Sequence, residues 1–163
     1  MANKNNHKVA IVMCRQSDYS TMKYTVNVLK ILKIKYVTKI VSAHRTPNRM
    51  FEFAKKAEKN NISVIIAGAG GSAHLPGMVA ALTRIPVIGV PIESKKLKGL
   101  DSLLSIAQMP KGIPVGTVAI GVDGAINAAL LSASILSVSD IKVKKSLENW
   151  RAKQTRSVKK KPR

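Results

Sequence analysis

Cysteine is nearly absent from this chain, and that scarcity excludes two kinds of site. Cys14 is the single cysteine among 163 residues, so the chain can form neither an internal disulfide nor a metal site built from several cysteines. A chain without disulfides fits a reducing compartment. The polar N-terminal segment leads into an apolar run at residues 9–13 that is too short for a signal peptide or a membrane span. We therefore expect a cytoplasmic protein with no membrane partner.

Aromatic and acidic residues are scarce as well. Aromatic residues make up 4% of a chain that is 45% hydrophobic, so the core must be built from aliphatic side chains, as α/β proteins often do. Eight acidic residues face 28 Lys and Arg, which gives a net charge of +20. Such a charge permits nucleic-acid binding, but the lysines are scattered and aromatic side chains for base stacking are few. We interpret the charge as a solvated surface and expect no nucleic-acid partner.

One stretch, residues 64–78 (VIIAGAGGSAHLPGM), joins a β-branched run to glycines and a new helix. Its first residues lack alternating polar partners, which indicates a strand buried on both faces of a parallel sheet. Gly68, Gly70 and Gly71 permit a sharp turn and leave backbone N–H groups uncovered, as an anion-binding loop requires. The alternative is a turn that only packs helix on strand. The spacing departs from the dinucleotide-binding fingerprint, so we expect no dinucleotide cofactor.

Strands and helices alternate along the whole chain. The pattern predicts strands at 8–13, 36–41, 64–66, 86–90 and 115–120, and helices at 21–34, 48–60, 76–83, 100–107 and 125–138. This alternation is typical of an α/β domain with a three-layer, doubly wound parallel sheet of the flavodoxin-like kind. Right-handed crossovers place all strand-to-helix loops at one edge, so we expect the loops 14–20, 42–47 and 68–76 to converge on one pocket.

The chain is predicted to form a single domain, residues 1–163. Its core spans about 8–138, and a basic helical arm at about 140–158 precedes a basic tail at 159–163. The arm carries the only tryptophan, Trp150, which either packs on its own domain or on a neighbouring subunit. The sequence leaves both possibilities open.

His44 and Arg45 lie side by side in the second loop. They pair a group that titrates near neutrality with a permanent cation that can grip phosphate or carboxylate. Ser42 adds a hydroxyl, and the helix that follows presents its N-terminus to anions. These residue types suit an anionic substrate. The alternative is an ordinary polar surface loop.

Asp18 and His74 complete the candidates in the three loops. Asp18 is the only acid there, so it is a candidate partner for sugar hydroxyls or for a histidine, with helix capping by Asp18 or Ser20 as the alternative. His74 can transfer a proton, although a loop histidine often serves as hydrogen-bonded scaffold. Two histidines and one carboxylate without helical spacing make a poor metal site, so we expect no metal.

Three long motifs identify a family. They are SAHRTP at 42–47, AGAGGSAHLPGM at 67–78 and GVPIESKKLKGLDSLLSIAQMPKGIPVGTVAIG at 89–121. With them, the chain resembles the bacterial N5-carboxyaminoimidazole ribonucleotide mutases of purine biosynthesis over about residues 8–155. The resemblance implies a three-layer α/β octamer without metal, nucleotide cofactor or biotin. It implies a reaction that moves a carboxyl group from an exocyclic nitrogen to a ring carbon through carbon dioxide held in a closed pocket.

The resemblance also implies roles for particular residues. His44 corresponds to the family's general acid and base, and Arg45 to the arginine that grips the phosphate. Asp18 corresponds to a ligand on the ribose side. The remaining positions match hydroxyls near the phosphate (Ser17, Ser42) and the loop that lines the carbon dioxide pocket (Gly70, Gly71, Ser72, His74).

The chain departs from the family at Cys14-Arg15, where the family reads Gly-Ser. A cysteine forced into a glycine conformation stores about 1–3 kcal/mol of strain. Arg15 either overfills the site, points outward or supplies a second phosphate contact, and we count it among the substrate-binding candidates. The alternative function is a catalytically impaired, nucleotide-binding relative.

Overall fold

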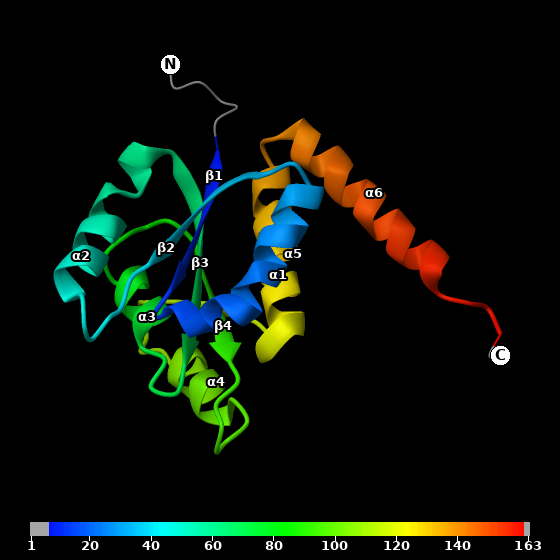
Figure 1. Cartoon of the computed structure of the whole chain (residues 1–163). Coiled ribbons are helices and arrows are strands. Elements are labelled where there is room, and N and C mark those ends of the chain that lie inside the picture. Colours follow the sequence, from blue (N-terminus) through cyan, green and yellow to red (C-terminus); the bar gives the residue numbers. More distant parts are fainter. Residues whose placement is uncertain (1–6, 162–163) are drawn as a thin grey trace.

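The structure, a computed structural model, describes residues 7–161 and contains one five-stranded parallel sheet (Figure 1). Its strands are β1 (Lys8–Met13), β2 (Lys35–Ile40), β3 (Ile62–Gly70), β4 (Val87–Ile92) and β5 (Gly116–Thr117). Its α-helices are α1 (Tyr19–Ile31), α2 (Pro47–Lys56), α3 (Leu75–Ala80), α4 (Leu100–Ala107), α5 (Gly121–Ser137) and α6 (Ile141–Ser157). Two 3-10 helices, η1 (Gln16–Asp18) and η2 (Glu58–Asn60), complete the described part.

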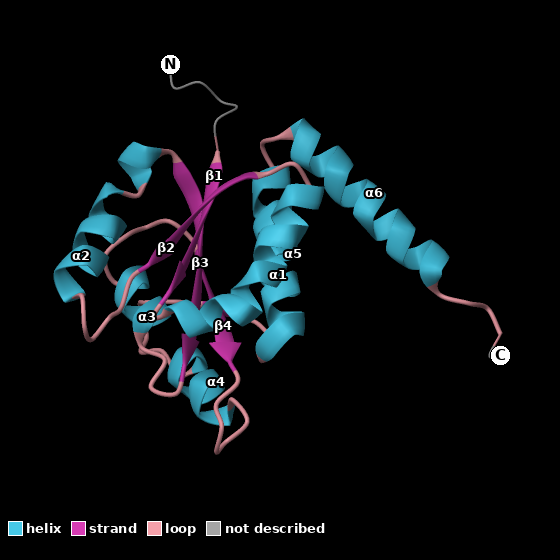
Figure 2. Cartoon of the chain, in the orientation of Figure 1, coloured by secondary structure: helices cyan, strands magenta, loops and turns pink. Residues whose placement is uncertain are grey.

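Helices cover both faces of the sheet, so the predicted three-layer fold is confirmed (Figure 2). α1 and α5 pack on one face through side chains such as Met22 of α1 and Ala129 of α5. α2, α3 and α4 pack on the other face through side chains such as Phe53 and Ile106. Successive residues of β3 point into alternate cores, and Ile65 and Ile66 are both fully buried. The continuous apolar run of this strand is therefore explained by burial on both faces.

The strand order is β2-β1-β3-β4-β5, which is the flavodoxin-like arrangement. The order changes direction between β1 and β3, because the chain runs outward from β1 to β2 and then returns past β1. Ligands of such sheets bind beyond the carboxyl ends of the strands at this switch point. The loops that follow β1 and β3 lie there.

Two of the three glycines predicted to form the turn lie instead within β3. Gly68 and Gly70 belong to the strand, and Gly71, with φ of 71°, makes the turn. Gly68 is needed for packing, since a Cβ at this position would lie 2.5 Å from the Met22 sulfur. The sequence prediction was wrong here because a close packing contact and a backbone turn both select glycine.

The last strand and the helix after it also differ from the prediction. β5 is limited to Gly116–Thr117 because only these residues pair with β4, so the rest of the predicted strand is irregular. α5 begins at Gly121 instead of residue 125. Gly124 lies in its first turn, where a Cβ would collide with the Ala119 carbonyl group. Gly124 is therefore a packing residue of the helix.

Two other helix boundaries shift. α1 begins two residues earlier than predicted, at Tyr19, and ends earlier, at Ile31. The second predicted helix divides, because α2 ends at Lys56 and the separate 3-10 turn η2 follows. Asn61, in the left-handed conformation with φ of 59°, ends that turn.

The arm, α6, packs on its own domain through its first half. Val143 and Leu147 are buried in the core shared with α1 and α5, and Trp150 packs against the same cluster. The Asp140 carboxylate caps the helix by accepting from the N–H groups of Lys142 and Val143. Residues 151–157 are exposed, and Figure 1 shows this end of α6 extending away from the domain. Within residues 7–161, no helix has the length and apolar character needed to cross a membrane.

Candidate active site

A cavity of about 850 Å³ opens at the carboxyl ends of β1, β3 and β4. Charged and hydroxyl side chains line most of it, and two glycines of the β3 loop form part of its wall. Its lining includes Arg15, Ser17, Asp18, Ser20, Thr21, Gly70, Gly71, Ile92, Glu93, Ser94, Lys95 and Lys98. The cavity therefore occupies the place that the strand order predicts for a ligand.

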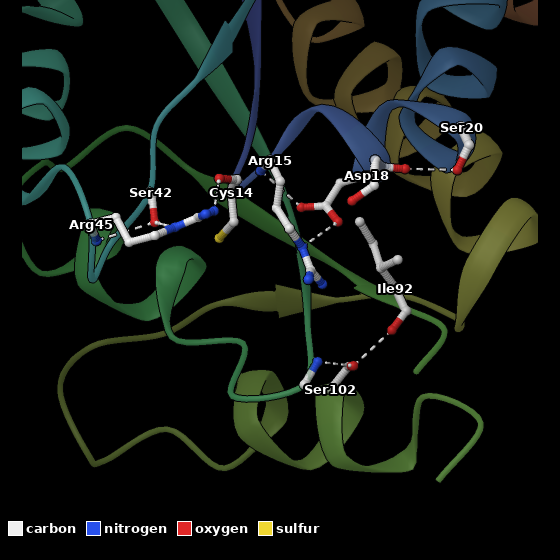
Figure 3. A network of polar contacts seen from close by, with 10 residues as sticks. Cys14, Arg15, Asp18, Ser20, Ser42, Arg45, Ile92 and Ser102 are labelled. Atoms are coloured by element: carbon white, nitrogen blue, oxygen red, sulfur yellow. Dashed lines mark hydrogen bonds and ion pairs between the residues drawn. The ribbon is translucent and has the colours of Figure 1, made fainter. Parts of the chain in front are cut away.

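Asp18 is a buried carboxylate in the wall of this cavity, with an exposed fraction of 2%. The Arg15 backbone N–H donates to Asp18 Oδ2 at 3.1 Å, and Arg15 Nε donates to Oδ1 at 3.3 Å (Figure 3). Burial raises the pKa of Asp18, while the charge and hydrogen bonds of Arg15 act in the opposite direction. The predicted helix cap is wrong, because neither the Asp18 nor the Ser20 side chain caps α1, and Ser20 Oγ donates to the Ser17 carbonyl.

Cys14 fits its position without the backbone strain that a glycine-like conformation would impose. It is absent from the non-glycine residues with positive φ, and Arg15 is extended with φ of −155°. The side chain is half-buried, and burial, followed by the nearby Asp18 charge, raises the pKa of the Cys14 thiol. The departure from the family is therefore accommodated by ordinary backbone geometry.

Figure 3 shows Arg45 and Arg15 on opposite sides of Cys14. Its Nη2 donates to the Cys14 carbonyl at 3.1 Å, and its backbone N–H donates to Ser42 Oγ at 3.3 Å. Ser42 is buried and Thr46 closes the loop on it, since Thr46 Oγ1 accepts from the Ser42 N–H at 2.9 Å. The loop thus ties the carboxyl ends of β1 and β2 together just before the N-terminus of α2.

His44 and His74 form a hydrogen-bonded pair across 30 residues of sequence. His44 Nε2 lies 2.9 Å from His74 Nδ1, and the two rings meet edge to face. Such a bond needs one N–H and one lone pair, so the two imidazoles can exchange a proton along it. Both side chains are exposed, and so is Ser72.

The glycine loop is held in place by α4. Ser102, which is fully buried, accepts from the Gly71 N–H at 2.8 Å and donates to the Ile92 carbonyl at 2.7 Å (Figure 3). Ser105 Oγ lies 3.3 Å from the Gly71 carbonyl. One serine therefore joins the ends of β3 and β4 at the cavity.

The predicted residues divide into two neighbouring groups within the single chain. The cavity brings together Arg15, Ser17, Asp18, Gly70 and Gly71. The second group comprises Ser42, His44, Arg45, Ser72 and His74, which do not line the cavity. The expectation that all three loops converge on one pocket is therefore only half fulfilled within one subunit, because the loop at 42–47 exposes His44 and Arg45 outside the cavity.

Sequence reasoning missed the loop after β4. Glu93, Ser94, Lys95 and Lys98 line the cavity opposite Arg15 and Asp18. The available signal was topological, because β4 lies beside β3 and its carboxyl end must open at the same edge of the sheet. Composition did not separate these lysines from the many others in the chain.

Two further features are outside this site. A larger hollow of about 1070 Å³ lies at the opposite edge of the sheet, around Arg84 and the C-terminal ends of α2 and α3, and none of the site residues predicted from the sequence lines it. We therefore assign the chemistry to the smaller cavity and its neighbouring histidines. In the described range 7–161, no cluster of three or more His, Cys, Asp or Glu residues could hold a metal ion.

Comparison with known proteins decides the family. A family model described as AIR carboxylase matches residues 8–157. The chain belongs to the AIR carboxylase family. It is 54% identical over 159 residues to the N5-carboxyaminoimidazole ribonucleotide mutase of Escherichia coli (strain K12), an alignment that covers 97% of this chain and 94% of that protein. It is 56% identical over 154 residues to the mutase of Brucella melitensis, covering 94% and 95% of the two chains.

A longer protein and a solved structure are also similar to this chain. The chain is 58% identical over 154 residues to a bifunctional purine synthesis protein of Dictyostelium discoideum, but spans only 15% of that protein's length. The crystal structure of Treponema denticola PurE superposes with a TM-score of 0.85 at 29% identity, over 93% of each chain. The fold and the family are therefore shown independently.

Proposed function

We propose that this protein converts N5-carboxyaminoimidazole ribonucleotide to 4-carboxy-5-aminoimidazole ribonucleotide in de novo purine (IMP) biosynthesis, as an intramolecular carboxyl-transferring mutase and thus an isomerase. The observation that carries the proposal is the match to mutases at 54–56% identity over nearly their full length. The residue types of the site suit this substrate and reaction. They include cations for a phosphate, a buried carboxylate for ribose hydroxyls and histidines for proton transfer.

His44 is the proposed catalytic residue. In the first step the bond between the exocyclic nitrogen and the carboxyl carbon breaks, carbon dioxide is released into the pocket, and His44 gives a proton to the nitrogen. In the second step the ring carbon attacks carbon dioxide, and His44 takes the proton that this carbon loses. The proton count returns to its starting value, so no cofactor is required. His74 Nδ1, 2.9 Å from His44 Nε2, holds the His44 imidazole in place for both proton transfers.

The remaining candidates bind substrate. Arg45, beside the N-terminus of α2, binds the phosphate in this proposal, with Ser42 and Ser17 as its hydroxyl partners. Asp18 accepts hydrogen bonds from the ribose, and Arg15 lies between it and the glycine loop. The backbone of the loop, at Gly70, Gly71, Ser72 and His74, encloses carbon dioxide and excludes water.

We further propose that the enzyme is a cytoplasmic homo-octamer in which neighbouring subunits close the site. The support is that His44, Arg45 and His74 are exposed on the single chain, whereas the reaction needs a pocket that retains carbon dioxide. The exposed end of α6 offers a second surface for subunit contact. Light scattering should give a mass near eight chains, and truncation after Ser139 should lower that mass or cause precipitation. A well-behaved full-length monomer at micromolar concentration would contradict this arrangement.

Turnover tests the proposal. Purified protein should convert the carboxyamino ribonucleotide to the carbon-carboxylated product faster than the spontaneous reaction, followed by absorbance. His44→Asn should retain substrate binding and lose turnover, because it removes the titrating group but keeps a polar side chain of similar reach. Binding without turnover by the native chain would favour the alternative, an impaired nucleotide-binding relative, for which the Cys14-Arg15 departure is the specific observation.

A further inference from the structure

Arg15 contacts Asp18 with two groups that can be separated by substitution. The Arg15 backbone N–H donates to Asp18 Oδ2, and this hydrogen bond does not depend on the side chain at position 15. The hydrogen bond to Oδ1 does, because its donor is the side-chain Nε. The side chain of Arg15 is 55% exposed and that of Asp18 is 2% exposed. The ion pair therefore joins a solvent-exposed guanidinium to a carboxylate that is almost completely shielded from water.

The rest of the Arg15 side chain points into the cavity. Nη2 lies 3.6 Å from the position that a Cβ on Gly70 would occupy, so the guanidinium reaches from Asp18 to the glycine loop. Among residues 7–161, neither Nη1 nor Nη2 has a hydrogen-bond partner. The Asp18 contact thus uses one edge of the guanidinium and leaves the other edge free.

Other charged groups around Asp18 do not replace this contact. Cys14 precedes Arg15 in the same loop, and the β4–α4 loop contributes Glu93, Lys95 and Lys98 to the same cavity. Arg15 is the only cation in the described part of the chain that makes an ion pair with Asp18. Loss of the Arg15 side chain would therefore leave the buried carboxylate with backbone donors alone.

We propose that Arg15 is a positioning residue that fixes the Asp18 carboxylate in its charged form, facing the cavity, and thereby extends ligand binding to lower pH. The inference rests on the proposed function only for the identity of the ligand that Asp18 meets. At position 15 the small residue of the family pattern is replaced by an arginine, whose guanidinium is the counter-ion of the Asp18 carboxylate. Arg15 acts through Asp18, so its loss should change the pH dependence of binding more than the rate of the chemical step.

The expected signs follow from the electrostatics. Removing the cation raises the pKa of Asp18, because it removes a charge that opposes the effect of burial. A carboxylate with a raised pKa binds ligand only above that pKa, and affinity falls about tenfold for each pH unit below it. Wild-type and Arg15→Gln proteins should therefore bind the ligand with equal affinity at high pH. As the pH falls, the affinity of Arg15→Gln should decrease first.

The experiment titrates Asp18 directly and needs no turnover. Carboxyl ¹³C NMR of the empty full-length protein gives the Asp18 titration in wild type, Arg15→Gln, Arg15→Lys and Arg84→Gln. Arg84→Gln is the matched control, because it removes the same charge from an ion pair with Glu58 at the opposite edge of the sheet. We expect a higher Asp18 pKa in Arg15→Gln, partial restoration in Arg15→Lys and the wild-type value in Arg84→Gln. A difference that shrinks in 1 M salt would confirm a charge effect.

Substrate affinity measured by calorimetry across pH completes the test. The Arg15→Gln affinity should fall at a higher pH than the wild-type affinity, by the same displacement that NMR gives for Asp18. An unchanged Asp18 titration in folded Arg15→Gln would overturn the inference. If the NMR displacement is present but neither protein binds the carboxyamino ribonucleotide, the proposed function fails, while the conclusion that Arg15 keeps the Asp18 carboxylate charged stands.

Discussion

Ser102→Ala is the substitution that most directly tests how the site is held together. The side chain is fully buried and joins the Gly71 N–H to the Ile92 carbonyl. Alanine removes both hydrogen bonds and leaves two backbone groups without their partner. An orphaned buried group costs about 1–3 kcal/mol, and the adjoining cavity allows water to reach part of this site, so we expect a total of about 2–4 kcal/mol.

Thermal unfolding measures this cost. For a chain of this size each kcal/mol lowers Tm by about 2–4 °C, which predicts a decrease of roughly 4–16 °C. Ser132→Ala is the matched control, because Ser132 is also fully buried but donates only to the Ala128 carbonyl one turn earlier in α5. That carbonyl lies within the helix and keeps its helical N–H partner. The control should therefore lose no more than about 1 kcal/mol, the net worth of one hydrogen bond.

The same substitution should loosen the glycine loop. Gly71 lines the cavity, so substrate affinity should weaken in Ser102→Ala and remain unchanged in Ser132→Ala. Calorimetry with the carboxyamino ribonucleotide separates this effect from stability, provided both variants are folded at the measuring temperature. Equal Tm values for the two variants would refute the argument that Ser102 secures the ends of β3 and β4.

Two further predictions concern packing and the arm. Gly89→Ala should lower the free energy of unfolding by about 1–3 kcal/mol, because a Cβ would press on the branched Ile106 side chain and approach Val115 within 3.1 Å. Denaturant unfolding measures this loss. Gly116→Ala is the control and should change little, because the nearest atom to its Cβ would be the Val87 carbonyl oxygen at 3.7 Å. Asp140→Ala should destabilise α6 by about 1 kcal/mol through loss of its N-cap. Amide hydrogen exchange at the start of the helix should then be faster than in wild type. Unaltered exchange there would show that core packing alone holds the arm.

Local sequence patterns predicted those elements whose apolar residues decide their structure. The bounds of β1 and α4 agree with the prediction, because a dense apolar run and a helical repeat leave few alternatives. β5 was overestimated because strand pairing depends on a partner outside the local sequence, and β4 offers only two paired positions. Gly68 and Gly70 were wrongly predicted to form a turn, because the sequence does not show which side chains pack against them across the core.

The candidate site was predicted as a set of residues but not as an arrangement. Loop position and residue chemistry were enough to select His44, Arg45 and Asp18. The contact between His44 and His74 arises from two loops that the sheet brings together, and no local pattern encodes it. The turn from Arg15 back to Asp18 likewise depends on the backbone of η1, so the sequence alone left the direction of the arginine open.

The most direct test of the central claim follows the migrating carboxyl group. Carboxyamino ribonucleotide labelled with ¹³C in its carboxyl group is turned over in unlabelled bicarbonate, and the product is analysed by mass spectrometry against a protein-free reaction. Intramolecular transfer through trapped carbon dioxide predicts that the product keeps the label, with enzyme-dependent formation that His44→Asn abolishes. An unlabelled product, or product formed equally fast from the decarboxylated ribonucleotide and bicarbonate, would contradict the mutase assignment and indicate carboxylation from solution.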